Sequence, residues 1–198
     1  MPTRLVVLIS GNGSNLQAIL DACASKELPA SVVAVFSNNA DAYGLVRAYE
    51  AGVKAIHFPK LESESRRDYD ARLAEDILTY APNYVVLAGW MRILTSAFLD
   101  HFPNHVVNLH PALPGMFPGM NAIERAFEAF KQNQISQTGV MVHLVPDETV
   151  DDGPVIASEI VSIQQNDTLE SLEARIHKVE HVLLINALKT ILTAKDTK

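Results

Sequence analysis

The stretch VVNLHPALPG, Val106–Gly115, carries an asparagine and a histidine two positions apart in an otherwise apolar run. In a β-strand such residues point to the same side, so Asn108 and His110 are predicted to project together. Pro111 cannot donate to a strand ladder and ends the run. An amide can donate to a developing oxyanion, and an imidazole can move a proton near neutral pH. The pair therefore indicates a catalytic site, the alternative being ordinary polar residues at a strand end.

A third group is needed to hold the imidazole or to relay its proton. The best candidates lie in the stretch PDETVDDGP, residues 146–154, whose acidic side chains are Asp147, Glu148, Asp151 and Asp152. Two alternatives stay open. Such a run is often a solvated hairpin loop, and carboxylates can also bind a divalent metal ion, although the spacing lacks the EF-hand order.

The stretch SGNGSN, residues 10–15, follows the first apolar run and precedes a helical pattern. Gly11 and Gly13 allow the backbone to approach a ligand, and the N–H groups at a helix start attract anions. We predict a phosphate monoester site there. The alternative is an ordinary tight turn in which Ser14 and Gln17 form a capping box. A dinucleotide site is disfavoured because the third glycine of that motif is missing.

The stretch HKVEH places His177 and His181 on one helical face, in a pattern shared with zinc proteases. A zinc site normally needs a third protein ligand, and the only acidic side chain further along the chain is that of Asp196. Zinc hydrolysis is therefore disfavoured, and the two histidines are predicted to line a helix face.

Through most of the chain, short β-branched runs alternate with amphipathic stretches. This alternation predicts an α/β fold with a doubly wound, mostly parallel sheet covered on both faces. After residue 135 two extended runs predict antiparallel strands added to the sheet, and a last helix is expected to start at DTLE, where Asp167 and Glu170 have capping-box spacing. In such a sheet ligands bind beyond the carboxyl ends of the parallel strands, which is where SGNGSN, AGWMRI and NLHPALPG fall.

Composition limits the class of protein. The 198 residues and 48% apolar content fit one domain, 1–198. A formal charge of −7 argues against nucleic-acid binding, which needs a surplus of Lys and Arg. The first apolar run is too short for a membrane span or a signal sequence, and the single cysteine, Cys23, excludes a disulfide framework and a cysteine-based metal site. We therefore expect a cytoplasmic protein without membrane or nucleic-acid partners.

Four stretches occur in the order and spacing of one enzyme family: VVLISGNGSNLQAILDA, VLAGWMRIL, NLHPALPGMFPG and GVMVHLVPDETVDDGPVI. On these motifs the chain resembles phosphoribosylglycinamide formyltransferase, the folate-dependent enzyme of purine biosynthesis. The resemblance runs from about Leu5 to about Leu188. It implies a formyltransferase-like Rossmann-type fold, the small-molecule substrates glycinamide ribonucleotide and 10-formyltetrahydrofolate, no metal, and a monomer or homodimer.

The resemblance also implies which residues form the site. They would be the catalytic Asn108, His110 and Asp151, the ribonucleotide-binding Gly13, Ser14, Asn15 and Glu180, and the folate-binding Arg66, Met91, Arg92, Ile93, Leu94 and Asn108. The N-terminal part, about 1–100, would bind the phosphate, and the C-terminal part, about 101–198, would carry the catalytic and folate site. Asn108 and protonated His110 would stabilise the oxyanion, with Asp151 supporting His110.

The chain departs from the family pattern in two of these stretches. Pro114 and Gly115 replace a Leu-Pro pair in the loop after His110. Asp152 stands where relatives often have a small residue, which makes it an alternative to Asp151, although Asp151 alone forms the D-x-G pattern.

Other functions are compatible with parts of the pattern. A formyltetrahydrofolate hydrolase or another formyl-folate-dependent transferase would share the fold, although the acidic charge disfavours a tRNA substrate. A phosphate-ligand sensor without chemistry would keep SGNGSN but would not need Asn108, His110 and Asp151 together.

Overall fold

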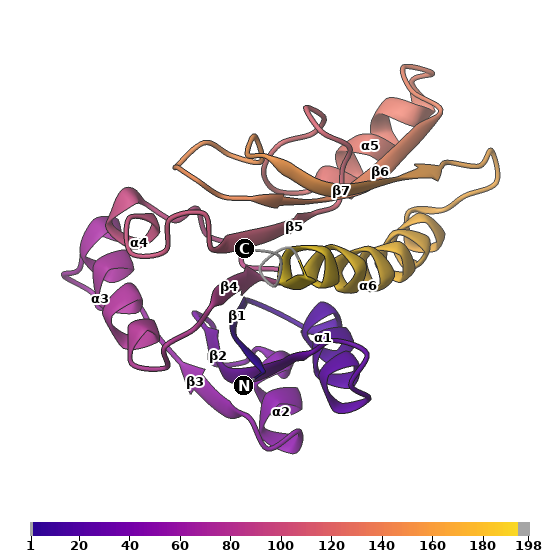
Figure 1. Cartoon of the computed structure of the whole chain (residues 1–198). Helices are drawn as coiled ribbons and strands as arrows, with labels where there is room; N and C mark the ends of the chain where they lie inside the picture. Colours follow the sequence, from indigo (N-terminus) through magenta and orange to yellow (C-terminus); the bar gives the residue numbers. More distant parts are fainter. Residues whose placement is uncertain (1, 194–198) are drawn as a thin grey trace.

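A computed structural model describes residues 2–193, and Figure 1 shows their arrangement. The strands are β1 (Thr3–Ile9), β2 (Ala30–Ser37), β3 (Lys54–His57), β4 (Tyr84–Leu87), β5 (Val106–His110), β6 (Gln137–Leu144) and β7 (Val155–Ser162). The helices are α1 (Ser14–Ala24), α2 (Tyr43–Glu50), α3 (Arg66–Leu78), α4 (Ser96–Leu99), α5 (Ala122–Lys131) and α6 (Leu169–Thr193). Strands and helices alternate through most of the chain, as predicted, although α4 and α5 were not predicted from the sequence.

The described residues form a seven-stranded sheet in the order β3-β2-β1-β4-β5-β6-β7. Strands β1 to β5 are parallel, while β6 pairs antiparallel with β5 and β7 antiparallel with β6. This confirms the predicted mostly parallel sheet with antiparallel C-terminal strands. Because the chain leaves β1 for β2 on one side and returns to β4 on the other, the strand order reverses between β1 and β4. A crevice at the carboxyl ends of these strands is the expected ligand site.

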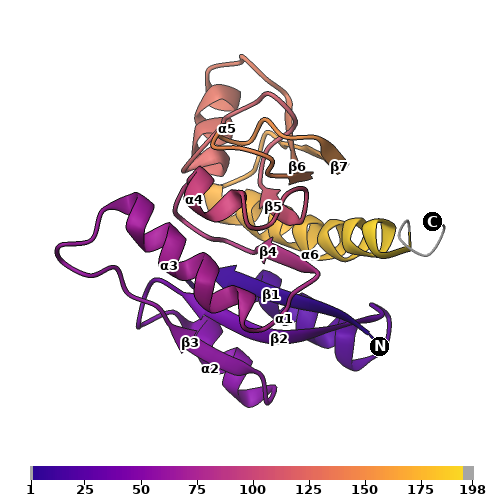
Figure 2. The same cartoon turned by 60° about the vertical axis from the view of Figure 1, so that its left-hand side comes forward.

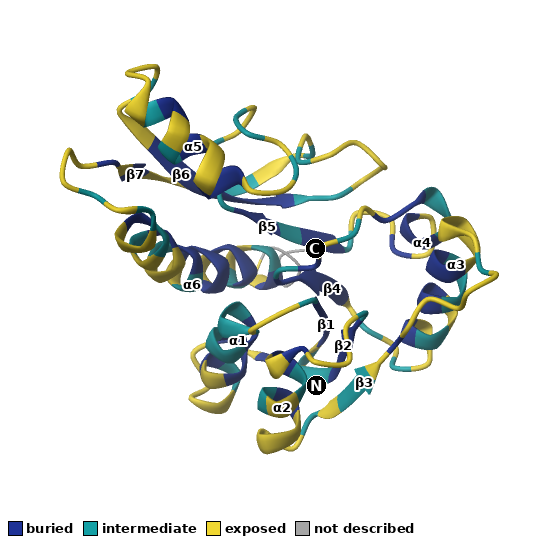
Figure 3. Ribbon diagram, turned by 180° about the vertical axis from the view of Figure 1, so that it is seen from behind, coloured by how far each residue is buried: buried dark blue, intermediate teal, exposed yellow. Residues whose placement is uncertain are grey.

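Both faces of the sheet are covered, as the continuous apolar strands predict. Alternate residues of β1 enter two separate cores: Leu5, Val7 and Ile9 pack with α1 and α6, whereas Val6 and Leu8 pack with α3 and α4. Figure 2 brings α3 and α4 in front of the sheet, and Figure 3 shows that burial is concentrated in the central strands. The central strands are therefore a rigid support for the loops at their ends.

The start of α6 differs from the prediction. The helix begins at Leu169, and Thr168 and Ser171 exchange the capping hydrogen bonds expected of Asp167 and Glu170. The Asp167 carboxylate instead accepts from Arg175, at 2.8 Å through Nη1. The spacing of the capping box was right, but its register was wrong by one residue because an ion pair occupies Asp167.

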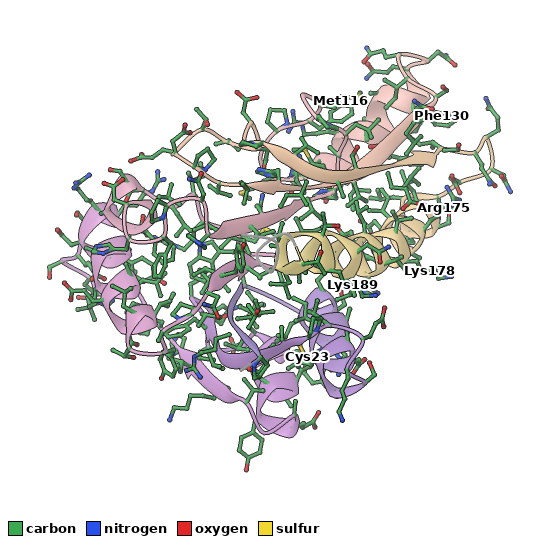
Figure 4. The ribbon with its side chains drawn as sticks, viewed as in Figure 1. Cys23, Met116, Phe130, Arg175, Lys178 and Lys189 are labelled. Carbon is green, nitrogen blue, oxygen red and sulfur yellow. The ribbon has the colours of Figure 1, made fainter. Side chains whose placement is uncertain are left out.

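Two other sequence expectations concern single residues. Cys23 lies on α1, in the lower half of the view in Figure 4, whereas Met116 lies in the upper half, and burial raises the pKa of the Cys23 thiol, so Cys23 is a poor nucleophile. Asp196, weighed above as a zinc ligand, lies outside the described residues. Between residues 2 and 193 no helix combines the length and apolar character that crossing a bilayer requires.

Candidate active site

A cavity of about 720 Å³ opens at the carboxyl ends of β4 and β5. Its walls come from the segment after β4, from β5 and the loop that follows it, and from the acidic loop between β6 and β7. The predicted site residues among its lining are Arg66, Met91, Arg92, Ile93, Leu94, Asn108, His110 and Asp151. A smaller hollow of about 190 Å³ near His101 and His105 lies at the amino ends of the same strands. The larger cavity is at the edge where the strand order predicts a ligand site.

The structure brings together Asn108, His110 and Asp151, which are up to 43 positions apart in the chain. The Asn108 amide donates to Asp151 Oδ1 at 3.0 Å, and His110 Nδ1 lies 3.2 Å from Asp151 Oδ2. Each carboxylate oxygen therefore contacts one of the two strand residues. Asp152, the alternative candidate, is solvent-exposed and is not among the residues that line the cavity.

His143 joins the same cluster, and no role was predicted for it from the sequence. It lies on β6 directly opposite Asn108 and is buried. Its Nδ1 is 2.8 Å from the Leu144 carbonyl oxygen, which can only accept, so this nitrogen carries a proton. Its Nε2 lies 3.1 Å from the Asn108 amide nitrogen and 3.5 Å from Asp151 Oδ1. His143 therefore contacts both Asn108 and Asp151.

His110 is buried although it lies at the end of its strand. Only 4% of its surface is exposed because the loop after β5 folds back over the ring. Its Nε2 lies 3.1 Å from the carbonyl oxygen of Phe117. Nδ1 thus faces the Asp151 carboxylate and Nε2 faces a carbonyl oxygen. If the ring gains a proton, both N–H groups of the imidazolium have an acceptor.

Burial and hydrogen bonding set the charges of this pair. Burial lowers the pKa of His110, against the opposing effect of the Asp151 carboxylate. For Asp151 burial acts to raise the pKa, but contacts with His143 and with the Gly119 N–H outweigh it and leave the pKa below its ordinary value. Near neutral pH the site therefore holds a carboxylate beside a neutral His110 imidazole.

The acidic loop has a backbone that holds Asp151 in place. Asp151 itself has a φ of 54°, in the left-handed region, and its carboxylate accepts from the Gly119 N–H at 2.8 Å. Two residues on, a Cβ at Gly153 would lie 1.8 Å from the Leu144 carbonyl oxygen. The glycine of D-x-G is therefore required where the loop returns against β6.

The glycine turn after β1 has the geometry of an anion site. Gly13 has a φ of 76° and approaches α2 so closely that a Cβ would lie 2.6 Å from the Gly44 Cα. It is the N-cap of α1 without a side-chain cap bond, so the alternative of a Ser14–Gln17 capping box is wrong. The first N–H groups of a helix have no intrahelical acceptor and are available to a ligand. Arg47, on α2, brings a positive charge next to this turn. Its Nε donates to the Asn12 carbonyl oxygen at 2.9 Å.

Glu180 lies beside this turn although it comes from α6. It is buried, and its Oε2 accepts from Asn15 at 3.1 Å and contacts His177 Nδ1 at 2.8 Å. This hydrogen bond raises the pKa of His177, while burial lowers that of His181. Within residues 2–193 no group of three or more His, Cys, Asp or Glu could hold a metal ion. The predicted phosphate turn and Glu180 thus form one polar cluster.

Ser10 connects this turn to the cavity. Its hydroxyl donates to Asn38 Oδ1 at 2.6 Å and accepts from the Met91 N–H at 2.9 Å. The end of β1, the end of β2 and the segment after β4 are therefore held in one arrangement by a single side chain.

Comparison with known proteins agrees with this geometry. Residues 3–188 match the family described as Formyl transferase. The chain belongs to the formyl transferase family. Its similar relatives include the phosphoribosylglycinamide formyltransferases of Schizosaccharomyces pombe, 46% identical over 98% of this chain and 99% of the relative, and of Dictyostelium discoideum, 44% identical over 98% of this chain and the whole relative. The crystal structure of glycinamide ribonucleotide transformylase 1 from Symbiobacterium toebii is 42% identical, with a TM-score of 0.89 over 95% of this chain and 86% of that one.

The family match covers residues 3–188. This range includes the residues that line the cavity and the cluster of Asn108, His110 and Asp151. The sequence resemblance to this family is confirmed over almost the whole chain. The cluster of amide, imidazole and carboxylate is suited to acyl transfer by proton movement and oxyanion stabilisation.

Proposed function

We propose that the chain transfers the formyl group of 10-formyltetrahydrofolate to the amine of glycinamide ribonucleotide, as a phosphoribosylglycinamide formyltransferase of purine biosynthesis. The observation that carries this proposal is the contact of Asn108, His110 and Asp151 at the wall of the large cavity in a member of the formyl transferase family. The reaction takes place in the cytoplasm between two small molecules and needs no nucleic-acid or membrane partner.

The folate is assigned to the cavity. Its volume of about 720 Å³ falls in the range usual for small-molecule sites. Met91 and Ile93 offer exposed apolar side chains, and Arg66 and Arg92 add positive charge for an acidic ligand. Leu94 is almost fully buried and supports this wall from behind.

The ribonucleotide is assigned to the glycine turn. Its phosphate accepts from the free N–H groups near Gly13, Ser14 and Asn15, and Glu180 accepts from its sugar hydroxyls. In this arrangement the N-terminal part of the domain, about 1–100, binds the phosphate, and the part from about 101 carries the catalytic groups. The two subsites meet at Ser10, which bonds to the segment that lines the cavity.

The reaction proceeds by direct attack. The amine nitrogen bonds to the formyl carbon, and the carbonyl electrons move to oxygen to give a tetrahedral oxyanion. Neutral His110 takes the proton that the attacking nitrogen must lose, through water, and Asp151 and the Phe117 carbonyl stabilise the imidazolium. The oxyanion then re-forms its double bond, the carbon–nitrogen bond to the folate breaks, and His110 returns the proton to the folate nitrogen. The products are formylglycinamide ribonucleotide and tetrahydrofolate.

Asn108 supplies the oxyanion donor in this mechanism. Its amide nitrogen faces both Asp151 and His143, so substrate binding must free one N–H from these partners. Hydrogen bonds of this kind often rearrange when the substrate complex forms. The role assigned to His110 differs from the sequence-based hypothesis, in which it was protonated from the start, because burial lowers its pKa.

The test is turnover of 10-formyltetrahydrofolate with and without glycinamide ribonucleotide, followed by folate absorbance. Turnover only in the presence of the ribonucleotide is expected. Turnover without it would identify a formyltetrahydrofolate hydrolase instead, and no turnover with either would identify a binding protein.

A further inference from the structure

The segment Met91–Thr95, called here the pocket segment, lines the folate cavity without being a helix or a strand. Side chains from other elements bind its main-chain groups. Met91 N–H donates to Ser10 Oγ at 2.9 Å, Arg66 Nε donates to the Ile93 carbonyl at 3.0 Å, and Thr95 N–H donates to Asp70 Oδ2 at 2.7 Å. Because no strand ladder holds this segment, its shape depends on these side chains.

One face of α3 carries most of this support. Arg66, Tyr69 and Asp70 are spaced three and four residues apart and therefore lie on the same side of the helix. The guanidinium of Arg92, in the pocket segment, lies over the ring of Tyr69, with its Cζ 4.6 Å from the ring centroid. This face of α3 therefore contacts the pocket segment at three of its residues, Arg92, Ile93 and Thr95.

Asp70 differs from the other supports because it cannot reach a ligand. Its side chain is entirely buried, and its Oδ1 has no hydrogen-bond partner within the described part of the chain. Burying a carboxylate costs free energy, and a single main-chain hydrogen bond offsets only part of that cost. The bond it makes is to Thr95, the N-cap of α4 and the last residue of the pocket segment.

We propose that Asp70 is a positioning residue for the folate subsite, which holds the end of the pocket segment by accepting from the Thr95 N–H. The inference rests on the proposed function for the identity of the ligand. Without the acceptor, the Thr95 N–H is left unpaired at a site with only 8% exposure, and the segment must shift to reach water. Leu94 and Ile93, the preceding residues, then move with it and change the cavity wall.

The matched pair Asp70→Asn and Asp70→Leu tests this role. Both replacements keep the number and branching of the side-chain heavy atoms of Asp, but only Asn keeps an acceptor for Thr95. Thr138→Val is the control, because Thr138 is also fully buried but lies on β6 away from the cavity. Kinetics with each substrate varied in turn give KM and kcat, and thermal unfolding measures stability.

Asp70→Leu is expected to raise KM for 10-formyltetrahydrofolate by roughly tenfold or more, with KM for the ribonucleotide within about twofold, while Asp70→Asn stays close to wild type. Equal changes in both KM values, or equal effects of Asn and Leu, would overturn the proposal and leave Asp70 a merely structural residue.

A second readout is independent of activity. Trp90 is the only tryptophan, borders the pocket segment and is 7% exposed. Asp70→Leu should shift Trp90 fluorescence to longer wavelength well below the unfolding temperature, and Asp70→Asn and Thr138→Val should not. An unchanged spectrum for Asp70→Leu would refute the positioning role. If the wild type fails to turn over the folate but the spectra behave as stated, the proposed function fails and the positioning of the segment stands.

Discussion

Gly153→Ala tests whether the path of the acidic loop governs catalysis. The added Cβ would lie 1.8 Å from the Leu144 carbonyl oxygen and 2.9 Å from Pro146 Cδ. Real Cβ contacts essentially never fall below 3.0 Å, so the loop and the end of β6 must separate by at least about 1.2 Å at this point. Asp151 is two residues away, and its contacts with Asn108 and His110 are only 3.0 and 3.2 Å long, so they cannot survive a shift of that size.

A misplacement of about 1 Å in a catalytic group can cost roughly 100-fold in rate, which is the expected loss in kcat for Gly153→Ala. The assay is steady-state formation of tetrahydrofolate at saturating ribonucleotide, with circular dichroism to show that the fold is kept. Asp152→Ala is the matched control, because this exposed neighbour lies in the same loop and should keep wild-type kcat.

The double variant gives the sharper comparison. If Gly153→Ala acts only by moving Asp151, it should cost little more in an Asp151→Ala background, because residues that act through one contact are not additive. A Gly153→Ala enzyme with wild-type kcat, or a full additional loss in the double variant, would refute the reasoning.

Three further outcomes follow from the geometry of the site. Asn108→Ala should lower kcat by roughly 100- to 1,000-fold, the usual cost of an oxyanion donor, in a variant whose circular dichroism shows that the fold is kept; full activity would exclude that role. In the proposed mechanism neutral His110 accepts a proton, and burial lowers its pKa, so kcat/KM should fall as the pH drops through a midpoint below 6.5; a profile flat down to pH 5 would contradict this. His143→Phe should lower kcat by roughly 10- to 100-fold through loss of its contacts with Asn108 and Asp151, and an effect on stability alone would disprove its part in the site.

The strands and the Asn108–His110 pair were predictable because they depend on local geometry. Alternation along a strand puts residues two apart on one side whatever the rest of the fold does. The sheet class was likewise predictable from apolar runs alternating with helical patterns, since burial on both faces leaves that signature.

His143 and the burial of His110 were not predictable in this way. His143 becomes meaningful only through the antiparallel register of β5 and β6, which pairs it with Asn108, and strand register depends on the turn and on packing between strands. His110 is covered by a loop with φ values of 76° at Gly115 and 47° at Phe117, and such a path depends on tertiary contacts. Asp151 could be selected over its acidic neighbours only through the family motif, because proximity across a loop is not a local property.

The central claim is that the formyl group passes directly from the folate to the ribonucleotide amine. The most direct test is mass spectrometry of the ribonucleotide product from folate carrying carbon-13 in its formyl group, with the reaction run in oxygen-18 water. Direct transfer predicts a product that contains the carbon-13 and none of the oxygen-18. An unlabelled ribonucleotide together with formate that contains both isotopes would contradict the account.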